Sequence, residues 1–229
     1  MKLVKFAAAA VLAASSFAAN ASLLQISGGT TVDIPAPKND FEKNFPLDQT
    51  YNVGGNLIVN ATGNYFLTYT LIGYEASYTN SFYINGDSGS VIDNQLSSGV
   101  TLSSLTAYTA GQALSFAFHT VQGNATVNNG SNLAMGLGNY NFAVALDTTF
   151  TPLAGDHNSV GKYYNVTGSP QSYDAVLFLD DVKGFGTPDD DNHDDLIIGI
   201  RIVKAPEPSA LLLMGLGLLG LAGARRLKA

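Results

Sequence analysis

Acidic side chains are concentrated in one short segment near the end of the chain. Seven aspartates fall within residues 180–195, where Lys183 is the one basic residue. Like charges this close repel one another, and a cation with about six to eight oxygen ligands would relieve the repulsion, as Ca²⁺ does. Carboxylate and amide oxygens also suit Ca²⁺ better than Zn²⁺. The predicted calcium ligands are Asp180, Asp181, Asp189, Asp190, Asp191, Asn192, Asp194 and Asp195.

Two apolar segments must position these oxygens. Residues 175–179 and 196–203 have the composition of buried strands, and an antiparallel hairpin between them would bring both acidic groups to one end of a sheet. Alternate residues of the second segment fall on one face: Leu196, Ile198, Ile200 and Ile202. The spacing is not that of an EF-hand. The alternative interpretation is a solvated acidic loop that protects a sheet edge from pairing.

This segment is similar to a hairpin found in exported bacterial β-domains. In that hairpin an acidic strand end is followed by a Gly-rich loop and an Asp-(Tyr/Phe)-Asn-Asp-Leu-Val strand start. Residues 178–181 and 192–197 occupy these two positions here, with Leu179 in place of a Glu and His193 in place of the aromatic residue.

Catalytic motifs are not recognised elsewhere in the chain. Residues 86–89 read Gly-Asp-Ser-Gly, which resembles the nucleophile segment of chymotrypsin-like proteases. That family has its histidine first, whereas His119, His157 and His193 all follow Ser88. No zinc-enzyme histidine spacing and no nucleotide-binding loop occurs. We therefore expect no enzyme activity; a hydrolase without an identifiable substrate is the alternative from that class, although the dense acids all lie in one loop.

The remainder of the central region predicts strands and turns. β-favouring segments alternate with turn signals such as Gly54-Gly55, Gly123-Asn124 and Asn129-Gly130, and no stretch shows sustained helical periodicity. The predicted strands are residues 56–60, 65–74, 81–84, 113–120, 140–146, 162–166, 175–179 and 196–203. We expect an all-β, antiparallel, jelly-roll-like β-sandwich. Residues 22–52, which contain Pro35, Pro37 and Pro46, are predicted as an extended lead-in to a body at residues 53–204.

The charge of this region excludes some partners. Residues 22–205 carry six basic and 17 acidic side chains, a net charge of −11, so we expect no nucleic-acid binding. Tyr74, Tyr78, Tyr83, Tyr163 and Tyr164 could stack on sugar rings, although strand packing also explains them. The chain has no cysteine, which excludes disulfides and thiolate sites.

The N-terminus has the pattern of a secretory signal. Lys2 and Lys5 precede an apolar stretch at residues 6–17, and Ala19-Asn20-Ala21 completes the pattern of a signal peptide. We predict a signal helix at residues 1–21, the Sec translocon and signal peptidase as partners, and cleavage that depends on Ala19 and Ala21.

The C-terminus has the pattern of a short membrane anchor. Pro206-Glu207-Pro208 precedes a Leu- and Gly-rich apolar run at residues 210–224, and Arg225 and Arg226 follow it. As a helix the run would span roughly 22 Å, short of a hydrocarbon core of about 30 Å, which suits a transient inner-membrane tether. The basic tail should remain cytoplasmic. We therefore predict a single hydrophobic helix within an anchor segment at residues 205–229.

Three features in this order resemble the PEP-CTERM sorting signal of Gram-negative bacteria: Pro206-Glu207-Pro208, the Leu/Gly-rich run and Arg225-Arg226. Ala205 stands where that signal usually has Val. The resemblance implies that an exosortase processes the chain near Pro-Glu-Pro and that exopolysaccharide and biofilm components accompany it. We expect an exported cell-surface or extracellular-matrix protein with a structural or adhesive role. The alternative is a carbohydrate-binding β-sandwich module that binds exopolysaccharide.

Overall fold

The computed structural model describes residues 22–33, 50–76, 78–84, 91–95, 100–132, 140–151, 162–164, 170–181, 193–206 and 213–220. These residues form antiparallel strands and one short helix at residues 213–220. The strands are β1 (Leu24–Ser27), β2 (Thr30–Asp33), β3 (Thr50–Val53), β4 (Asn56–Val59), β5 (Gly63–Glu75), β6 (Asn80–Ile84), β7 (Val91–Asp93), β8 (Thr101–Tyr108), β9 (Phe116–Thr120), β10 (Ala125–Asn128), β11 (Asn141–Phe150), β12 (Lys162–Tyr164), β13 (Gln171–Asp180) and β14 (Leu196–Lys204). The expectation of an all-β, antiparallel fold is confirmed.

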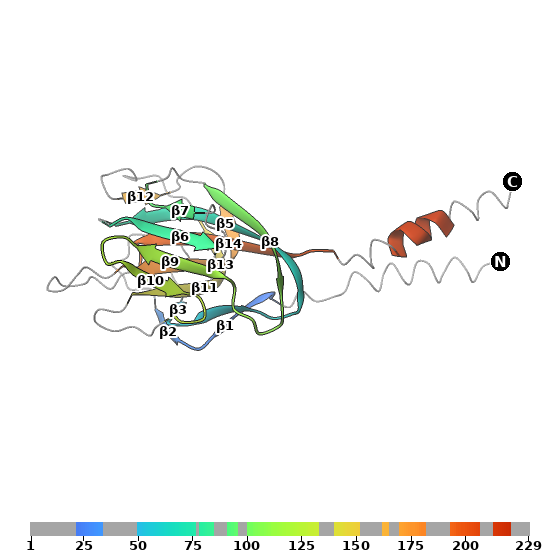
Figure 1. Cartoon of the computed structure of the whole chain (residues 1–229), viewed down its shortest axis with the longest axis horizontal. Coiled ribbons are helices and arrows are strands. Elements are labelled where there is room, and N and C mark those ends of the chain that lie inside the picture. The colour runs from blue at the N-terminus through green and yellow to red at the C-terminus, as the bar shows by residue number, and fades with distance from the viewer. Residues whose placement is uncertain are drawn as a thin grey trace.

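Three sheets build the body. The main sheet has eight strands in the order β12-β5-β14-β13-β11-β3-β2, and β8 also pairs with β5. A second sheet has the order β10-β9-β6-β7, and β1 pairs with β4 in a two-stranded sheet. In Figure 1 the β10-β9-β6-β7 sheet lies over the main sheet, as in a β-sandwich. Jelly-roll connectivity stays a prediction.

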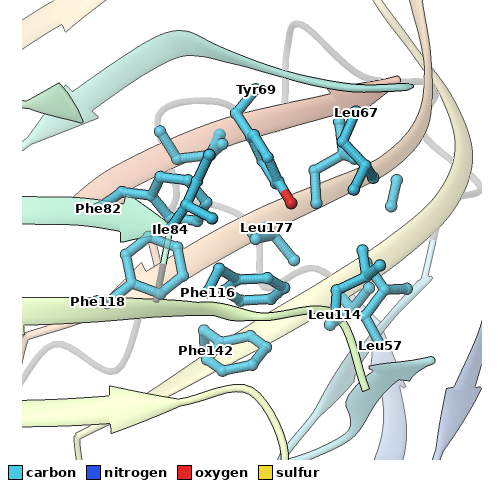
Figure 2. Packing of buried hydrophobic residues seen from close by; sticks show 14 of the residues in the cluster. Leu57, Leu67, Tyr69, Phe82, Ile84, Leu114, Phe116, Phe118, Phe142 and Leu177 are labelled. Atoms are coloured by element: carbon cyan, nitrogen blue, oxygen red, sulfur yellow. The ribbon is translucent and has the colours of Figure 1, made fainter. Parts of the chain in front are cut away.

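The core lies between the two larger sheets. Period-two alternation turns Leu67, Tyr69 and Leu71 of β5 inward, and Leu177 and Leu179 of β13 share that face. Figure 2 shows these strands packing against aromatic rings from the second sheet. The ring centroids of Phe82 and Phe118 are 5.2 Å apart, and those of Phe116 and Phe142 are 5.5 Å apart. Ring pairs at this spacing stabilise the core beyond the area that they bury.

Buried asparagines join the strands around this core. Asn129 donates through Nδ2 to the carbonyl oxygens of Leu57 and Leu114, at 2.7 and 2.8 Å, and accepts from the backbone nitrogen of Leu57 at 2.8 Å. Asn132 makes the corresponding contacts with the carbonyl oxygens of Gly55 and Phe142 and with the Phe142 nitrogen. These two side chains therefore connect backbone groups of separate segments, and each supplies an acceptor to a buried backbone nitrogen, that of Leu57 or Phe142.

The outer face of the main sheet carries a second apolar cluster. Tyr51, Phe150, Val176, Phe178 and Ile197 are among its buried members. Gly199 on the same face leaves room for the ring of Tyr173, which a Cβ at that position would overlap. The guanidinium of Arg201 lies 5.1 Å from the centroid of this ring, in cation–π geometry.

The structure differs from the sequence prediction at several strands. Residues 22–52 supply β1, β2 and most of β3, and Leu24 is buried in the core, so this segment takes part in the sheets rather than only leading into them. The predicted strand at residues 113–120 begins only at Phe116, and the predictions omitted β7, β8 and β10. The predicted signal helix, with Ala19 and Ala21, lies outside the described residues.

The described part of the predicted apolar run at residues 210–224 is helical. The structure describes helix at residues 213–220, and these residues are exposed. Within the described ranges, no helix has both the length and the apolarity needed to cross a membrane. The prediction of a transmembrane helix is therefore not met by the described part of the chain.

Candidate functional site

The last hairpin brings its acidic ends together at one end of the main sheet. β13 and β14 pair antiparallel with Leu179 opposite Leu196, so Asp180 and Asp181 lie beside Asp194 and Asp195. This arrangement confirms the predicted hairpin. Asp180, Asp181 and Asp194 are buried, with exposed fractions of 2%, 4% and 0%, although aspartate is rarely buried without partners. The other predicted ligands, Asp189, Asp190, Asp191 and Asn192, lie outside the described residues.

Hydrogen bonds connect this acidic end to the second sheet. Asn80 of β6 donates through Nδ2 to Asp181 Oδ2 at 2.7 Å, and Thr120 of β9 donates to Asn80 Oδ1 at 2.8 Å. The backbone nitrogen of Asn80 donates to Asn94 Oδ1 at 3.2 Å. Asp181 therefore joins the two layers of the sandwich through a buried polar chain. Sequence reasoning missed Asn80 and Thr120, which gave no local signal.

Asp195 forms hydrogen bonds across the same hairpin, with backbone groups at the end of β13. Its Oδ2 accepts a hydrogen bond from the Asp181 backbone nitrogen at 2.7 Å, and its own nitrogen donates to the Leu179 oxygen at 3.2 Å. The pKa of Asp195 is raised well above its ordinary value, first by burial and then by the charge of Asp181. Asp194 and Asp180 raise this pKa further, whereas the bond from the Asp181 nitrogen lowers it. The carboxylates are therefore close enough to repel one another.

His193 lies beneath the acidic end as a packed ring. Its φ is 54°, a left-handed conformation that turns the chain before β14, and the side chain is fully buried. His193 Nε2 lies 2.7 Å from Asn141 Oδ1, an acceptor, so this ring nitrogen donates. The ring centroid lies 5.4 Å from that of Tyr51. His193 thus packs as a buried ring at the position where the hairpin resemblance has an aromatic residue.

The described acids do not make a metal site by themselves. Over the residues whose positions the structure gives, no group of three or more His, Asp or Glu side chains could hold a metal ion. Asp181 and Asp195 instead accept bonds from Asn80 and from the backbone of the hairpin. A calcium site at this end would therefore need oxygen ligands from Asp189, Asp190, Asp191 and Asn192.

The other candidate residues are dispersed. His119 Nδ1 contacts Thr126 Oγ1 of the neighbouring strand at 3.1 Å, whereas Ser88 and His157 lie outside the described residues. Tyr74, Tyr78 and Tyr83 are partly buried, and the side chains of Tyr163 and Tyr164 are not described. The described tyrosines of this set therefore present no fully exposed ring for sugar stacking.

The predicted sorting segment directly follows β14, a central strand of the main sheet. β14 lies between β5 and β13 and ends at Lys204, and the Ala205 nitrogen donates to the Asn64 oxygen at 2.7 Å. Pro206 is exposed one residue later, while Glu207, Pro208, Arg225 and Arg226 lie outside the described residues. The Pro-Glu-Pro sequence thus begins two residues beyond the last strand.

Comparison with known protein families identifies this segment. The family model of the PEP-CTERM protein-sorting motif matches residues 204–226, which begin at the last residue of β14. No curated protein and no solved structure matches the chain.

Proposed function

Because residues 204–226 form a PEP-CTERM sorting motif, which indicates an exported protein that an exosortase processes, we propose that this chain is a structural or adhesive protein of the cell surface or extracellular matrix. The position of this motif is the observation that carries the proposal. It directly follows a folded β-rich body whose described acids are held in internal hydrogen bonds. Such a body suits a stable surface component.

The proposed route has two processing steps. The Sec translocon exports the chain, and signal peptidase cuts after Ala21. The apolar run at residues 210–224 then holds the precursor in the inner membrane, with Arg225 and Arg226 on the cytoplasmic side. An exosortase cuts near Pro206-Glu207-Pro208 and frees the body for the surface. The exposure of Pro206 supports access to this sequence.

Cell fractionation tests this route. We expect cells with an exosortase to yield a mature protein at the surface or in the medium that lacks residues beyond the Pro-Glu-Pro sequence. Cells without the exosortase should retain the longer form in the inner membrane. Mass spectrometry of the C-terminus distinguishes the two forms. Full-length protein in the cytosol of both strains would refute the proposal.

We also propose that Ca²⁺ stabilises the acidic hairpin. Asp180, Asp181, Asp194 and Asp195 would contribute carboxylates, and the loop at residues 189–192 would supply the remaining oxygen ligands. Support comes from the donor chemistry, which suits Ca²⁺, and from the pKa of Asp195, which is raised first by burial and then by the neighbouring Asp181 carboxylate. A bound divalent cation would offset that repulsion.

A calcium titration followed by thermal unfolding tests this proposal. Calcium at about 100 times its dissociation constant should stabilise the protein by about 2.7 kcal/mol. That corresponds to a rise in Tm of roughly 5–10 °C for a body of this size. Asp195→Asn should reduce the rise, whereas Asp147→Asn, an exposed acid on β11, should preserve it. An unchanged Tm in the wild-type protein at millimolar calcium would exclude the site.

The alternative function is binding of exopolysaccharide by the same scaffold. The frequency of tyrosine favours it, but the partial burial of Tyr74, Tyr78 and Tyr83 leaves less ring surface for stacking. Glycan-array binding by the mature protein would favour this alternative over a purely structural role.

A further inference from the structure

Three exposed apolar side chains form a continuous row across the main sheet. Val203 of β14 pairs with Phe66 of β5, and Phe66 pairs with Leu105 of β8. Their exposed fractions are 61%, 49% and 61%. Directly opposed residues in antiparallel strands have Cβ atoms about 5 Å apart, so these side chains are neighbours. We call Val203, Phe66 and Leu105 the apolar row.

The row lies on the outer face of the sheet. Its chain neighbours Ile202 and Leu67 are buried in the core, and successive side chains of a strand point to opposite faces. Single exposed apolar residues are ordinary on a protein surface, but a contiguous set commonly marks a contact site. The row is therefore a candidate contact site for an apolar partner.

The location of the row points to the membrane. Val203 immediately precedes the sorting motif, which begins at Lys204, and Figure 1 shows β14 running to the end of the body from which the chain continues toward the C-terminal helix. Leu213 of that helix is ten residues after Val203. At about 3.5 Å per residue this segment reaches at most about 35 Å. A tethered precursor therefore holds the row close to the bilayer surface.

The distribution of charge favours the same orientation. Arg201 lies two residues before Val203, on the same face of β14, and is exposed. Lys204 follows Val203 at the end of the strand and is also exposed, and these are two of the three basic residues in the described part of the body. The acidic end of the β13–β14 hairpin lies at the opposite end of β14, beside Leu196. Among the described acids, Asp174 of β13 lies beside this end of β14, because its Oδ2 accepts from the Ile202 nitrogen at 2.8 Å. Cations near a bilayer favour contact with anionic headgroups, and the acidic end points away from them.

We propose that the apolar row is a bilayer-contact surface that rests on the periplasmic face of the inner membrane while the precursor is tethered. This inference depends on the proposed function, because it requires the C-terminal segment to hold the chain at a membrane. Phe66, Leu105 and Val203 enter the headgroup region, and Arg201, which shares their face of β14, contacts anionic lipids. Contact of this kind would hold the Pro-Glu-Pro sequence at the membrane surface, where a membrane-embedded exosortase acts.

Fluorescence quenching in vesicles tests the inference. The chain has no native cysteine, so Leu105→Cys gives one site for an environment-sensitive fluorophore. Val121→Cys is the matched control, because Val121 is 53% exposed and follows Thr120, which contacts Asn80 at the acidic end. The full-length labelled chain is reconstituted into phosphatidylcholine vesicles with and without phosphatidylglycerol, and brominated lipids serve as quenchers. Flotation of the same samples measures membrane association.

The expected result is lipid quenching at position 105 at least about threefold that at position 121, as for side chains that enter the interface. Phe66→Ser together with Val203→Ser should reduce the quenching at 105 toward the control value, and omission of phosphatidylglycerol should weaken it. Circular dichroism verifies that these variants fold.

The outcomes that oppose the inference are distinct from failure of the proposed function. A chain that floats with the vesicles but shows equal quenching at 105 and 121 overturns the inference and leaves the tether intact. Shielding of the label at 105 without lipid quenching indicates a second copy as the partner, which also overturns it. A chain that does not associate with vesicles overturns the tether and the inference together.

Discussion

Replacing Asn129 by alanine should destabilise the sandwich more than any single polar contact would suggest. Asn129 is 8% exposed and makes three hydrogen bonds to the backbone of Leu57 and Leu114. The two carbonyl oxygens retain other donors, because Leu57 also accepts from the Leu114 nitrogen and Leu114 from the Phe116 nitrogen. The Leu57 nitrogen, by contrast, loses its acceptor.

The magnitude follows from these separate losses. A buried donor left unsatisfied costs about 1–3 kcal/mol, and each of the two lost amide–carbonyl bonds costs about 0.5–1.5 kcal/mol. The sum is about 2–6 kcal/mol, a large part of the roughly 5–15 kcal/mol that stabilises a typical domain. A value near the middle of this range lowers Tm by roughly 8–16 °C.

Urea and thermal unfolding, followed by circular dichroism, measure the change. Asn128→Ala is the control, since Asn128 is the exposed neighbour on β10 and its loss should change stability by no more than about 0.5 kcal/mol. Asn129→Asp retains an acceptor for the Leu57 nitrogen but places a carboxylate against two carbonyl oxygens, so it should also destabilise. If Asn129→Ala unfolds within error of Asn128→Ala, the buried asparagine does not join these strands.

Three further predictions concern the sheet face and the acidic end. Gly199→Ala should destabilise the protein by about 1–3 kcal/mol, because the added Cβ overlaps the Tyr173 ring. In a Tyr173→Ala background the same substitution should destabilise the protein clearly less. Equal losses of stability in the two backgrounds, measured by thermal unfolding, would contradict the overlap. The raised pKa of Asp195 means that the folded state retains the Asp195 proton to higher pH than the unfolded state does. In calcium-free buffer, the stability of the protein should therefore fall as pH rises above about 3.8 and through the folded pKa. Asp195→Asn should flatten this part of the Tm–pH profile, and an identical slope in the variant would refute the assignment. Asn80→Ala should lower stability by about 1–3 kcal/mol, because it removes the hydrogen bond that Asn80 of the second sheet donates to buried Asp181. The control Ser81→Ala, on the same strand, should change stability by less than about 0.5 kcal/mol. Equal unfolding midpoints for the two variants would disprove a stabilising hydrogen bond between the two sheets.

The parts of the fold that sequence predicted well are those whose signal is local. Residues 175–179 and 196–200 are apolar on both faces because β13 and β14 lie in the middle of the sheet with clusters on either side. β8 was missed because its Thr- and Ser-rich sequence is that of a strand with one exposed face. The prolines of residues 22–52 suggested a lead-in, yet Leu24 packs in the core once β1 pairs with β4.

The candidate site was predictable only as far as the hairpin extends. The acidic groups at residues 180–181 and 194–195 are adjacent because the antiparallel register of β13 and β14 places Leu179 opposite Leu196. Composition and periodicity can indicate such a pairing of neighbouring strands. The partners of these acids come from distant positions: Asn80 lies 101 residues before Asp181, and Asn141 lies 52 residues before His193. Asparagine is common in turns, so nothing in the local sequence marks Asn80 or Asn141 as buried donors or acceptors.

The central place of β14 bears on when the body can fold during export. It is the last strand of the described body to be synthesised, yet it alone connects β5 to β13 in the order of the main sheet. A nascent chain that lacks Leu196–Lys204 would consist of two half-sheets with open edges, one ending at β5 and the other at β13. Assembly of the whole sheet must therefore wait until Leu196–Lys204 has been synthesised, and this delay leaves the polypeptide unfolded for longer during export.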